Sequence, residues 1–133
     1  LSLIAYPGIF KAAICRYAVS NLITLATDTH KFEKHYLDFL VGILPRDKNL
    51  YEQRSPVFSA DKIQDPVAIF QGEKDLVVPP SQSDQIVDSL ARRKIPHVYC
   101  LYPDEGHGWQ GRETIRHYYE TVESFLTEQI NKP

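Results

Sequence analysis

The sequence is short of the features that mark several classes of protein. It holds two cysteines, Cys15 and Cys100, and one tryptophan among 133 residues. No apolar run approaches the roughly 20 residues that a membrane-spanning helix needs. The formal net charge of −2 provides no basic face for nucleic acid. These absences predict a globular protein whose partners include neither a membrane nor a nucleic acid.

The residues that are present suit one domain. The chain is 43% hydrophobic and 24% charged, which is ordinary for a globular domain with a sizeable core. It opens on Leu1 rather than methionine, and residues 1–8 are typical of the last turns of a helix that ends at Pro7 and Gly8. We therefore expect residues 1–133 to begin inside a domain whose first part, with any targeting segment, lies upstream.

Both cysteines lie in apolar, strand-like runs. Such residues are most often small buried hydrophobes of a reducing compartment, which favours a cytoplasmic location without establishing it. Their spacing alone does not indicate a disulfide. Neither Cys15 nor Cys100 lies in a Gly-flanked turn, so neither resembles a catalytic thiol.

Apolar periodicity divides the chain into alternating strands and helices. Strands are predicted at 11–19, 66–71 and 97–102, the first of them buried on both faces. Helices are predicted at 27–44, at 81–94 with Ser81 as N-cap, and at 112–130, while a loop at 46–65 holds one short helix near 50–54. This alternation is typical of an α/β fold with a parallel sheet and crossover helices. About three strands are few for a doubly wound sheet, which favours a portion of a larger domain.

The predicted helix at 27–44 carries an apolar stripe, and Pro45 is expected to end it. The stripe consists of Phe32, Tyr36, Phe39, Leu40 and Ile43. We expect these side chains to pack in the core, with a place in a substrate cleft as the alternative for Tyr36 and Phe39. Packing is also expected for Trp109, with a wall of the active site as its alternative.

Two short loops follow the second and third predicted strands. One runs Gly72-Glu73-Lys74-Asp75-Leu76-Val77-Val78-Pro79 and the other Asp104-Glu105-Gly106-His107-Gly108-Trp109. Ligands bind at the carboxyl ends of parallel strands, so Asp75 and His107 are expected to lie close together. A neutral imidazole can take a proton from a nucleophile while a carboxylate on its other nitrogen fixes the tautomer. Either residue alone is more often a turn residue, but their matching positions predict the acid and the base of a hydrolase.

The third member of such a triad is missing from the sequence. No Gly-x-Ser-x-Gly elbow occurs in the 133 residues. Ser20 lacks flanking glycines, and Ser81 and Ser83 belong to a helix, so capping or loop roles are favoured for all three. His30 and His35 are five residues apart and no His-Glu-x-x-His or Cys-x-x-Cys spacing occurs, so no metal or other cofactor is predicted.

Longer patterns in the chain resemble the prolyl oligopeptidase family of serine peptidases. The Gly-x-x-Asp-x-x-Val-Pro pattern at 72–79 is similar to the acid loop of that family, and residues 105–108 are similar to its histidine loop. Residues 29–33, 36–38 and 54–56 resemble its acylaminoacyl-peptidase and dipeptidyl-peptidase-like branch. The resemblance covers essentially the whole chain.

This resemblance implies that residues 1–133 are the C-terminal part of an α/β-hydrolase catalytic domain. Asp75 would be the orienting acid and His107 the general base, while the serine, oxyanion donors and a β-propeller would precede Leu1. The family's sheet order would place the strands of Cys15 and Cys100 on either side of the middle strand. Two strand spacings of about 4.8 Å each exceed the reach of about 7 Å between the Cα atoms of a disulfide, which disfavours that bridge.

Three hypotheses about function follow from the sequence. In the first, the chain is part of a serine peptidase that hydrolyses short peptides by acyl transfer, and the isolated chain is inactive because it lacks the serine. The second keeps the fold but exchanges the peptide for an ester, thioester or lactone. The third is a non-catalytic fragment that pairs with the missing half or with itself, because a sheet cut beside its nucleophile strand exposes an edge and an apolar face.

Overall fold

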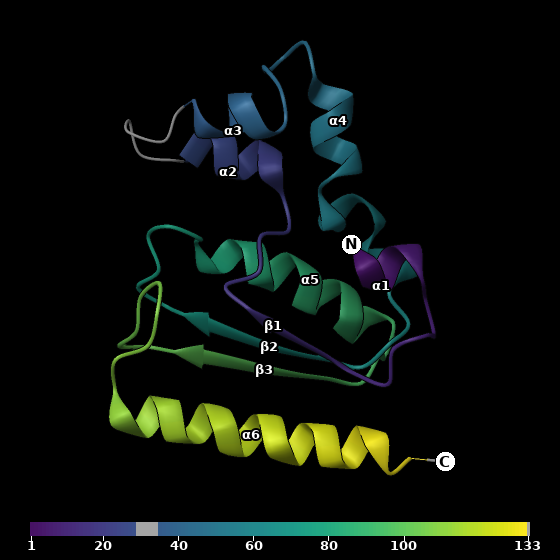
Figure 1. Ribbon diagram of the computed structural model, residues 1–133, viewed down its shortest axis with the longest axis vertical. Helices are drawn as coiled ribbons and strands as arrows, with labels where there is room; N and C mark the ends of the chain where they lie inside the picture. Colours follow the sequence, from purple (N-terminus) through teal and green to yellow (C-terminus); the bar gives the residue numbers. More distant parts are fainter. Residues whose placement is uncertain (29–34, 133) are drawn as a thin grey trace.

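Figure 1 shows the computed structural model of the chain, which describes residues 1–28 and 35–132. Its strands β1 (Ala13–Arg16), β2 (Val67–Gly72) and β3 (His97–Tyr102) form one parallel sheet in the order β1-β2-β3. The helices are α1 (Ser2–Ala5), α2 (Leu22–Asp28), α3 (Tyr36–Leu40), α4 (Lys48–Gln53), the 3-10 helix η1 (Pro56–Lys62), α5 (Pro80–Arg92) and α6 (Arg112–Ile130). The α/β fold with about three parallel strands, predicted from the sequence, is confirmed.

The central strand β2 supplies side chains to both layers of the core. All six of its residues are buried, as expected of a parallel strand covered on both faces. Because alternate side chains of a strand point to opposite faces, Val67 and Ile69 pack toward α5 and η1, whereas Ala68 and Phe70 pack toward α6. Burial of each large apolar side chain stabilises the fold by about 1.5–3 kcal/mol.

Helices α5 and α6 cover opposite faces of the sheet (Figure 1). Leu90 of α5 is fully buried in one core cluster, and Phe125 of α6 is buried in the other. Because β2 and β3 are parallel, α5 must carry the chain back across the sheet between them. The carboxyl ends of the two strands therefore lie side by side, with Gly72 paired to Tyr102.

The single helix predicted at 27–44 is wrong for the described residues. The chain forms two short helices, α2 and α3, and residues 29–34 lie outside the described part. Helix α2 begins earlier than predicted because the side-chain oxygen of Asn21 accepts the backbone N–H of Ile23 at 3.0 Å, as a capping residue does. Beyond α3 the chain turns at Gly42, whose φ of 139° is a conformation that favours glycine.

The apolar stripe of that predicted helix is not a core face. Phe39 is 88% exposed and Tyr36 is 61% exposed, whereas the buried residue of α3 is Leu37. Phe32 lies outside the described residues. The spacing of apolar residues indicates a face but does not indicate whether another element covers it, which explains the error.

Three further boundaries differ from the prediction. Strand β1 is shorter than 11–19 and only partly buried, because it forms an edge of the described sheet. Ser81 does not cap α5, since the helix begins at Pro80 with Pro79 as its N-cap. The 3-10 helix η1 lies where a loop was expected, whereas the short helix near 50–54 is present as α4.

The two cysteines are both free. Cys15 lies on β1 opposite Ile69, and Cys100 lies on β3 opposite Phe70, so β2 runs between them. This is the strand arrangement that the family resemblance implies, and it keeps the two thiols from meeting.

Candidate active site

The loops that follow β2 and β3 are bonded directly to each other. The backbone N–H of Glu73 donates to the carbonyl of Tyr102, and that of Lys74 donates to the carbonyl of Glu105, both at 2.9 Å. A Cβ atom at Gly72 would lie 2.5 Å from the carbonyl oxygen of Glu105 and closer still to that of Gly106. Only glycine permits this close approach of the two loops, because any other residue would place its Cβ atom against these carbonyl oxygens.

Asp75 lies in the first of these loops with a fully buried side chain. Its Oδ1 accepts the backbone N–H groups of Val77 at 2.9 Å and Val78 at 2.8 Å, which closes a turn around the carboxylate. Its Oδ2 lies 3.0 Å from Nδ1 of His107 and 3.3 Å from Nε2 of Gln71. A buried carboxylate with these partners is satisfied and held in one orientation.

His107 lies in the second loop and differs from Asp75 in its exposure. Its side chain is 42% exposed, whereas that of Asp75 is 0% exposed. When Nδ1 carries the proton toward Asp75, the other ring nitrogen, Nε2, is left as an acceptor for the proton of a reacting group. The structure therefore brings together the two residues that the sequence singled out, in the geometry that a general base and its orienting acid need.

Glu105 holds the histidine loop in shape. Its buried carboxylate accepts the backbone N–H groups of Gln110 and Gly111, each at 2.9 Å. The hydrogen bond from Gln110, with smaller contributions from the side chain of Thr114 and the N–H of Gly111, holds the pKa of Glu105 below its usual value. The ionised carboxylate thus links the loop that carries His107 to the residues at the start of α6 by hydrogen bonds.

Aromatic rings support the exposed imidazole from one side. The ring of Tyr17, just beyond β1, lies 4.8 Å from that of His107 and 5.3 Å from that of Trp109. Trp109 in turn contacts Tyr118 at 4.6 Å between ring centroids. These contacts agree with the packing role expected for Trp109. The tryptophan also lines one cavity together with His107 and Tyr17, so its alternative place in a wall of the active site stays open.

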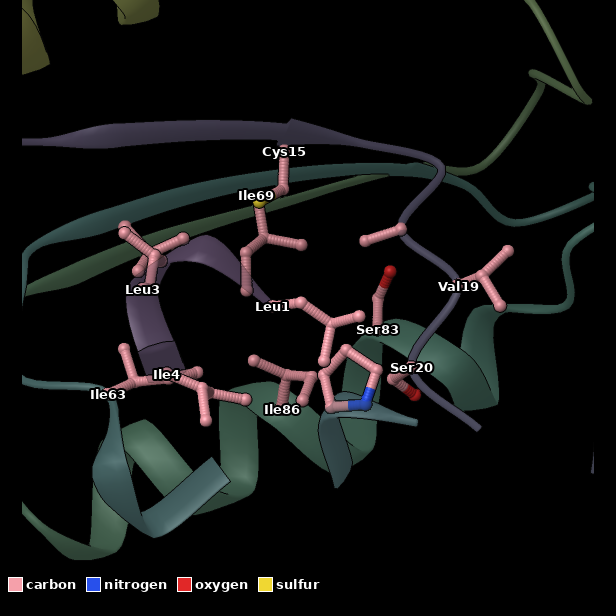
Figure 2. Close-up of a pocket in the computed structure, with 13 residues that line it drawn as sticks. Leu1, Leu3, Ile4, Cys15, Val19, Ser20, Ile63, Ile69, Ser83 and Ile86 are labelled. Atoms are coloured by element: carbon pink, nitrogen blue, oxygen red, sulfur yellow. The ribbon is translucent and has the colours of Figure 1, made fainter. Parts of the chain in front are cut away.

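A separate apolar pocket of about 130 Å³ lies between α1, β1 and α5 (Figure 2). Neither Asp75 nor His107 lines it. Ser20 lies at its edge, but its Oγ donates to the backbone carbonyl of Gln82 at 2.6 Å and is buried, so the hydroxyl is not presented to a substrate. Burial raises the pKa of the Cys15 thiol, which disfavours the reactive thiolate.

The described part of the chain shows neither a metal-binding cluster nor a membrane-spanning helix. Across residues 1–28 and 35–132, no group of three or more His, Cys, Asp or Glu side chains is placed to hold a metal ion. His30 lies outside those residues, and His35 bonds Asp38 instead. Within the same ranges, no helix has both the length and the apolar character to cross a membrane.

Sequence reasoning missed three residues that build the site. The sequence predicted Gln71 only as the last residue of a strand and Tyr17 only as part of an apolar strand. Glu105 was identified only as one residue of the histidine loop pattern. A glutamine that ends an otherwise apolar buried strand, next to the acid loop, is the signal that could have identified Gln71.

Residues 1–133 match the prolyl oligopeptidase family over their whole length. The chain belongs to the prolyl oligopeptidase family. Among curated relatives, it is 31% identical over 128 residues to dipeptidyl peptidase family member 6 of Caenorhabditis elegans, covering 92% of this chain and 17% of that protein. It is 33% identical over 127 residues to dipeptidyl aminopeptidase BIII of Pseudoxanthomonas mexicana, covering 92% of this chain and 18% of that protein.

Solved structures agree with this assignment. A Mycobacterium tuberculosis puromycin-hydrolysing peptidase superposes with a TM-score of 0.90 at 36% sequence identity, over 98% of this chain and 20% of that one. The family resemblance inferred from the sequence is thus confirmed. The chain spans about a fifth of the length of the curated relatives and of this structure.

Proposed function

We propose that this chain supplies the general base and the orienting acid of a serine peptidase that cleaves short peptides. The observation that carries the proposal is the 3.0 Å contact between Nδ1 of the accessible His107 and Oδ2 of the buried Asp75. The chain order of acid before base supports it, since α/β hydrolases have that order. Membership of the prolyl oligopeptidase family supports the peptidase chemistry.

The nucleophile in this proposal is a serine outside residues 1–133. Its Oγ attacks the carbonyl carbon of the scissile amide while Nε2 of His107 takes the hydroxyl proton, and Asp75 stabilises the imidazolium that forms. The tetrahedral intermediate collapses as His107 returns that proton to the leaving amine. A water molecule then attacks the acyl carbon while His107 takes one of its protons. The bond from that carbon to the serine Oγ breaks as His107 gives the proton to Oγ, which releases the acid product and restores the serine hydroxyl.

The relatives support a substrate class. The two curated relatives are named as a dipeptidyl peptidase and a dipeptidyl aminopeptidase, and the M. tuberculosis protein is named as a puromycin-hydrolysing peptidase. We therefore assign to the complete protein a short peptide or aminoacyl amide as substrate. Its further parts, in this proposal, are the rest of the hydrolase domain and a β-propeller. The free cysteines suit a reducing, cytoplasmic compartment.

The test compares matched amide and ester substrates in the full-length protein. Dipeptidyl and aminoacyl anilides are assayed beside the corresponding methyl esters, and His107→Ala is assayed on both. We expect both classes to be cleaved and both rates to collapse in the variant. Cleavage of esters without amides would replace the peptidase by an esterase of the same fold. Amide cleavage that survives His107→Ala would refute the role of this residue.

The isolated chain is proposed to be inactive and to self-associate. Leu1, which lines the apolar pocket together with Cys15 of β1, is 57% exposed, and Ile9, four residues before β1, is 71% exposed. The outer edge of β1 has no strand partner among the described residues. Exposed strand edges and apolar patches promote association. Sedimentation of the chain should show dimers or larger species that dissociate on dilution, whereas a strict monomer at all concentrations would contradict this part of the proposal.

A further inference from the structure

A buried glutamine connects the central strand to the acid loop. Gln71 lies in β2 and is 0% exposed. Its Nε2 lies 3.0 Å from the carbonyl oxygen of Val78, 3.2 Å from that of Gly72 and 3.3 Å from Oδ2 of Asp75. The amide therefore contacts both ends of the acid loop and the carboxylate between them. A buried amide without such partners would be strongly unfavourable, so these contacts hold the loop closed.

Ser83 of α5 bonds the other end of this amide. Its Oγ lies 2.8 Å from Oε1 of Gln71, and its side chain is fully buried. Every group around Nε2 is a hydrogen-bond acceptor, so turning the amide over would set its oxygen against three other oxygens. The hydroxyl of Ser83 is labelled among the residues around the apolar pocket in Figure 2, on the α5 side of the sheet. The network thus has one consistent arrangement, with the amide donating toward Asp75.

The carboxylate of Asp75 is restrained from both of its oxygens. Two backbone N–H groups bond Oδ1, and because the carboxylate is planar they also restrict where Oδ2 lies. The terminal torsion of an aspartate is broad, so a further contact on Oδ2 narrows the remaining swing of the group. Gln71 supplies that contact at Oδ2, the oxygen that also faces His107.

We propose that Gln71, held by Ser83, is a positioning residue that keeps the carboxylate of Asp75 aimed at His107. The inference rests on the proposed function for its catalytic consequence, but its structural part concerns only the Asp75–His107 hydrogen bond. Gln71 touches no substrate and moves no proton in this account. It acts through Asp75.

A second buried glutamine provides a matched control. Gln82 of α5 is 1% exposed, and its Oε1 accepts the backbone N–H groups of Ser20 at 2.9 Å and Asn21 at 2.7 Å. Gln82 therefore holds the segment after β1 by hydrogen bonds, just as Gln71 holds the acid loop. Unlike Gln71, it does not bond Asp75. Replacing either glutamine by methionine removes a buried amide of the same size, so the two variants share the loss of stability but not the effect on the site.

The first experiment is nuclear magnetic resonance of the full-length protein with 15N-labelled histidine, with the His107 signals identified as those missing in His107→Ala. The imidazole nitrogen shifts report the tautomer of His107, and a low-field Nδ1 proton signal reports its bond to Asp75. We expect Gln71→Met to weaken or abolish that signal and to mix the tautomers, Ser83→Ala to do so in part, and Gln82→Met to leave both unchanged. An unchanged signal in Gln71→Met and Ser83→Ala would overturn the proposal, as would an equal loss in Gln82→Met.

The second experiment measures a double-mutant cycle in the full-length enzyme. Gln71→Met should lower kcat about tenfold, the value of one good hydrogen bond, with KM changed by less than about twofold. In the Asp75→Asn background the same substitution should cost nothing further, because its effect passes through Asp75. A full tenfold loss in both backgrounds would show that Gln71 acts only on the fold. If the full-length protein cleaves no peptide, there is no peptidase activity for the variants to lose. The resonance experiment still decides the positioning role in that case.

Discussion

The two loops that carry Asp75 and His107 are built in opposite ways. The acid loop is closed inward, with the Asp75 side chain fully buried and its carboxylate bonded by backbone N–H groups and by Gln71. The histidine loop is held by the Glu105 carboxylate, which accepts backbone N–H groups at the end of the loop, while the His107 side chain remains 42% exposed. The orienting group is thus fixed and buried, whereas the group that must meet a substrate is supported but accessible.

This difference follows from the tasks of the two groups. A carboxylate that only orients a base gains from exclusion of water, because charge interactions strengthen in a low-dielectric setting. A base must receive a proton from outside and cannot be enclosed in the same manner. The contacts between the loops, at Gly72 and Lys74, then hold the buried carboxylate and the accessible imidazole at a constant separation.

The largest effect is expected from the two central residues. Asp75→Asn and His107→Ala in the full-length enzyme should each lower kcat by about 10³–10⁴-fold, since triad members act as a unit. Both variants should keep the fold, because each replaces a side chain without opening the apolar core. Steady-state kinetics with circular dichroism as the folding control measures this. A loss smaller than tenfold in either variant would remove that residue from the proposed catalytic pair.

The next effect concerns the close approach of the loops. Gly72→Ala introduces a Cβ that meets the carbonyl oxygens of Glu105 and Gly106, so the free energy of unfolding should fall by about 3 kcal/mol. Gly106→Ala is the matched control, because its Cβ would lie 3.6 Å from the carbonyl oxygen of Lys74, an ordinary contact. Chemical denaturation of the two variants should separate them clearly. Equal stabilities would show that the loops are free to move apart.

A smaller effect is expected from the staple beneath the histidine loop. Glu105→Gln should cost about 1–3 kcal/mol of stability at pH 7, since it removes a charge that two backbone N–H groups bond. The lowered pKa of Glu105 makes this contribution complete above the ordinary value of 4.5 and lost as the pH falls through the lower folded value. Denaturation of both proteins across pH 3–7 checks the sign. A difference that persists undiminished in acid would contradict the role of the ionised carboxylate.

The smallest effect is expected from the exposed ion pair between the loops. Lys74 Nζ lies 2.8 Å from Oδ1 of Asp104, but both side chains are largely exposed. Such pairs contribute little, so Lys74→Ala and Asp104→Ala should each leave the midpoint of thermal unfolding and kcat essentially unchanged. Thermal unfolding and kinetics measure this. A large loss would mean that charge, rather than backbone bonding, holds the loops together.

Much of the fold was predictable where strong periodicity coincided with clear boundaries. Strand β3 and helix α6 match the predicted ranges 97–102 and 112–130, and β2 differs by one residue at each end. The nearness of Asp75 and His107 was also predictable, because parallel strands joined by a crossover helix must end at the same edge. No contact had to be known for that inference, only the order of the elements.

The remaining features depend on contacts that periodicity cannot supply. Helix α2 starts where Asn21 caps it, and α3 leaves Phe39 exposed although its spacing is that of a core residue. The role proposed for Gln71 requires the position of Ser83 on a different element, 12 residues away in the chain. Side chains that act through other side chains are recorded in the sequence only as single polar residues in apolar surroundings.

The most direct test of the central claim is labelling with a fluorophosphonate, read by intact mass. The 133-residue chain, the full-length protein and its His107→Ala variant are treated side by side. We predict one adduct on the full-length protein, on a serine outside these residues, much slower labelling of the variant, and none on the 133-residue chain. An adduct on the short chain itself, or a labelling rate that His107→Ala leaves unchanged, would contradict the account.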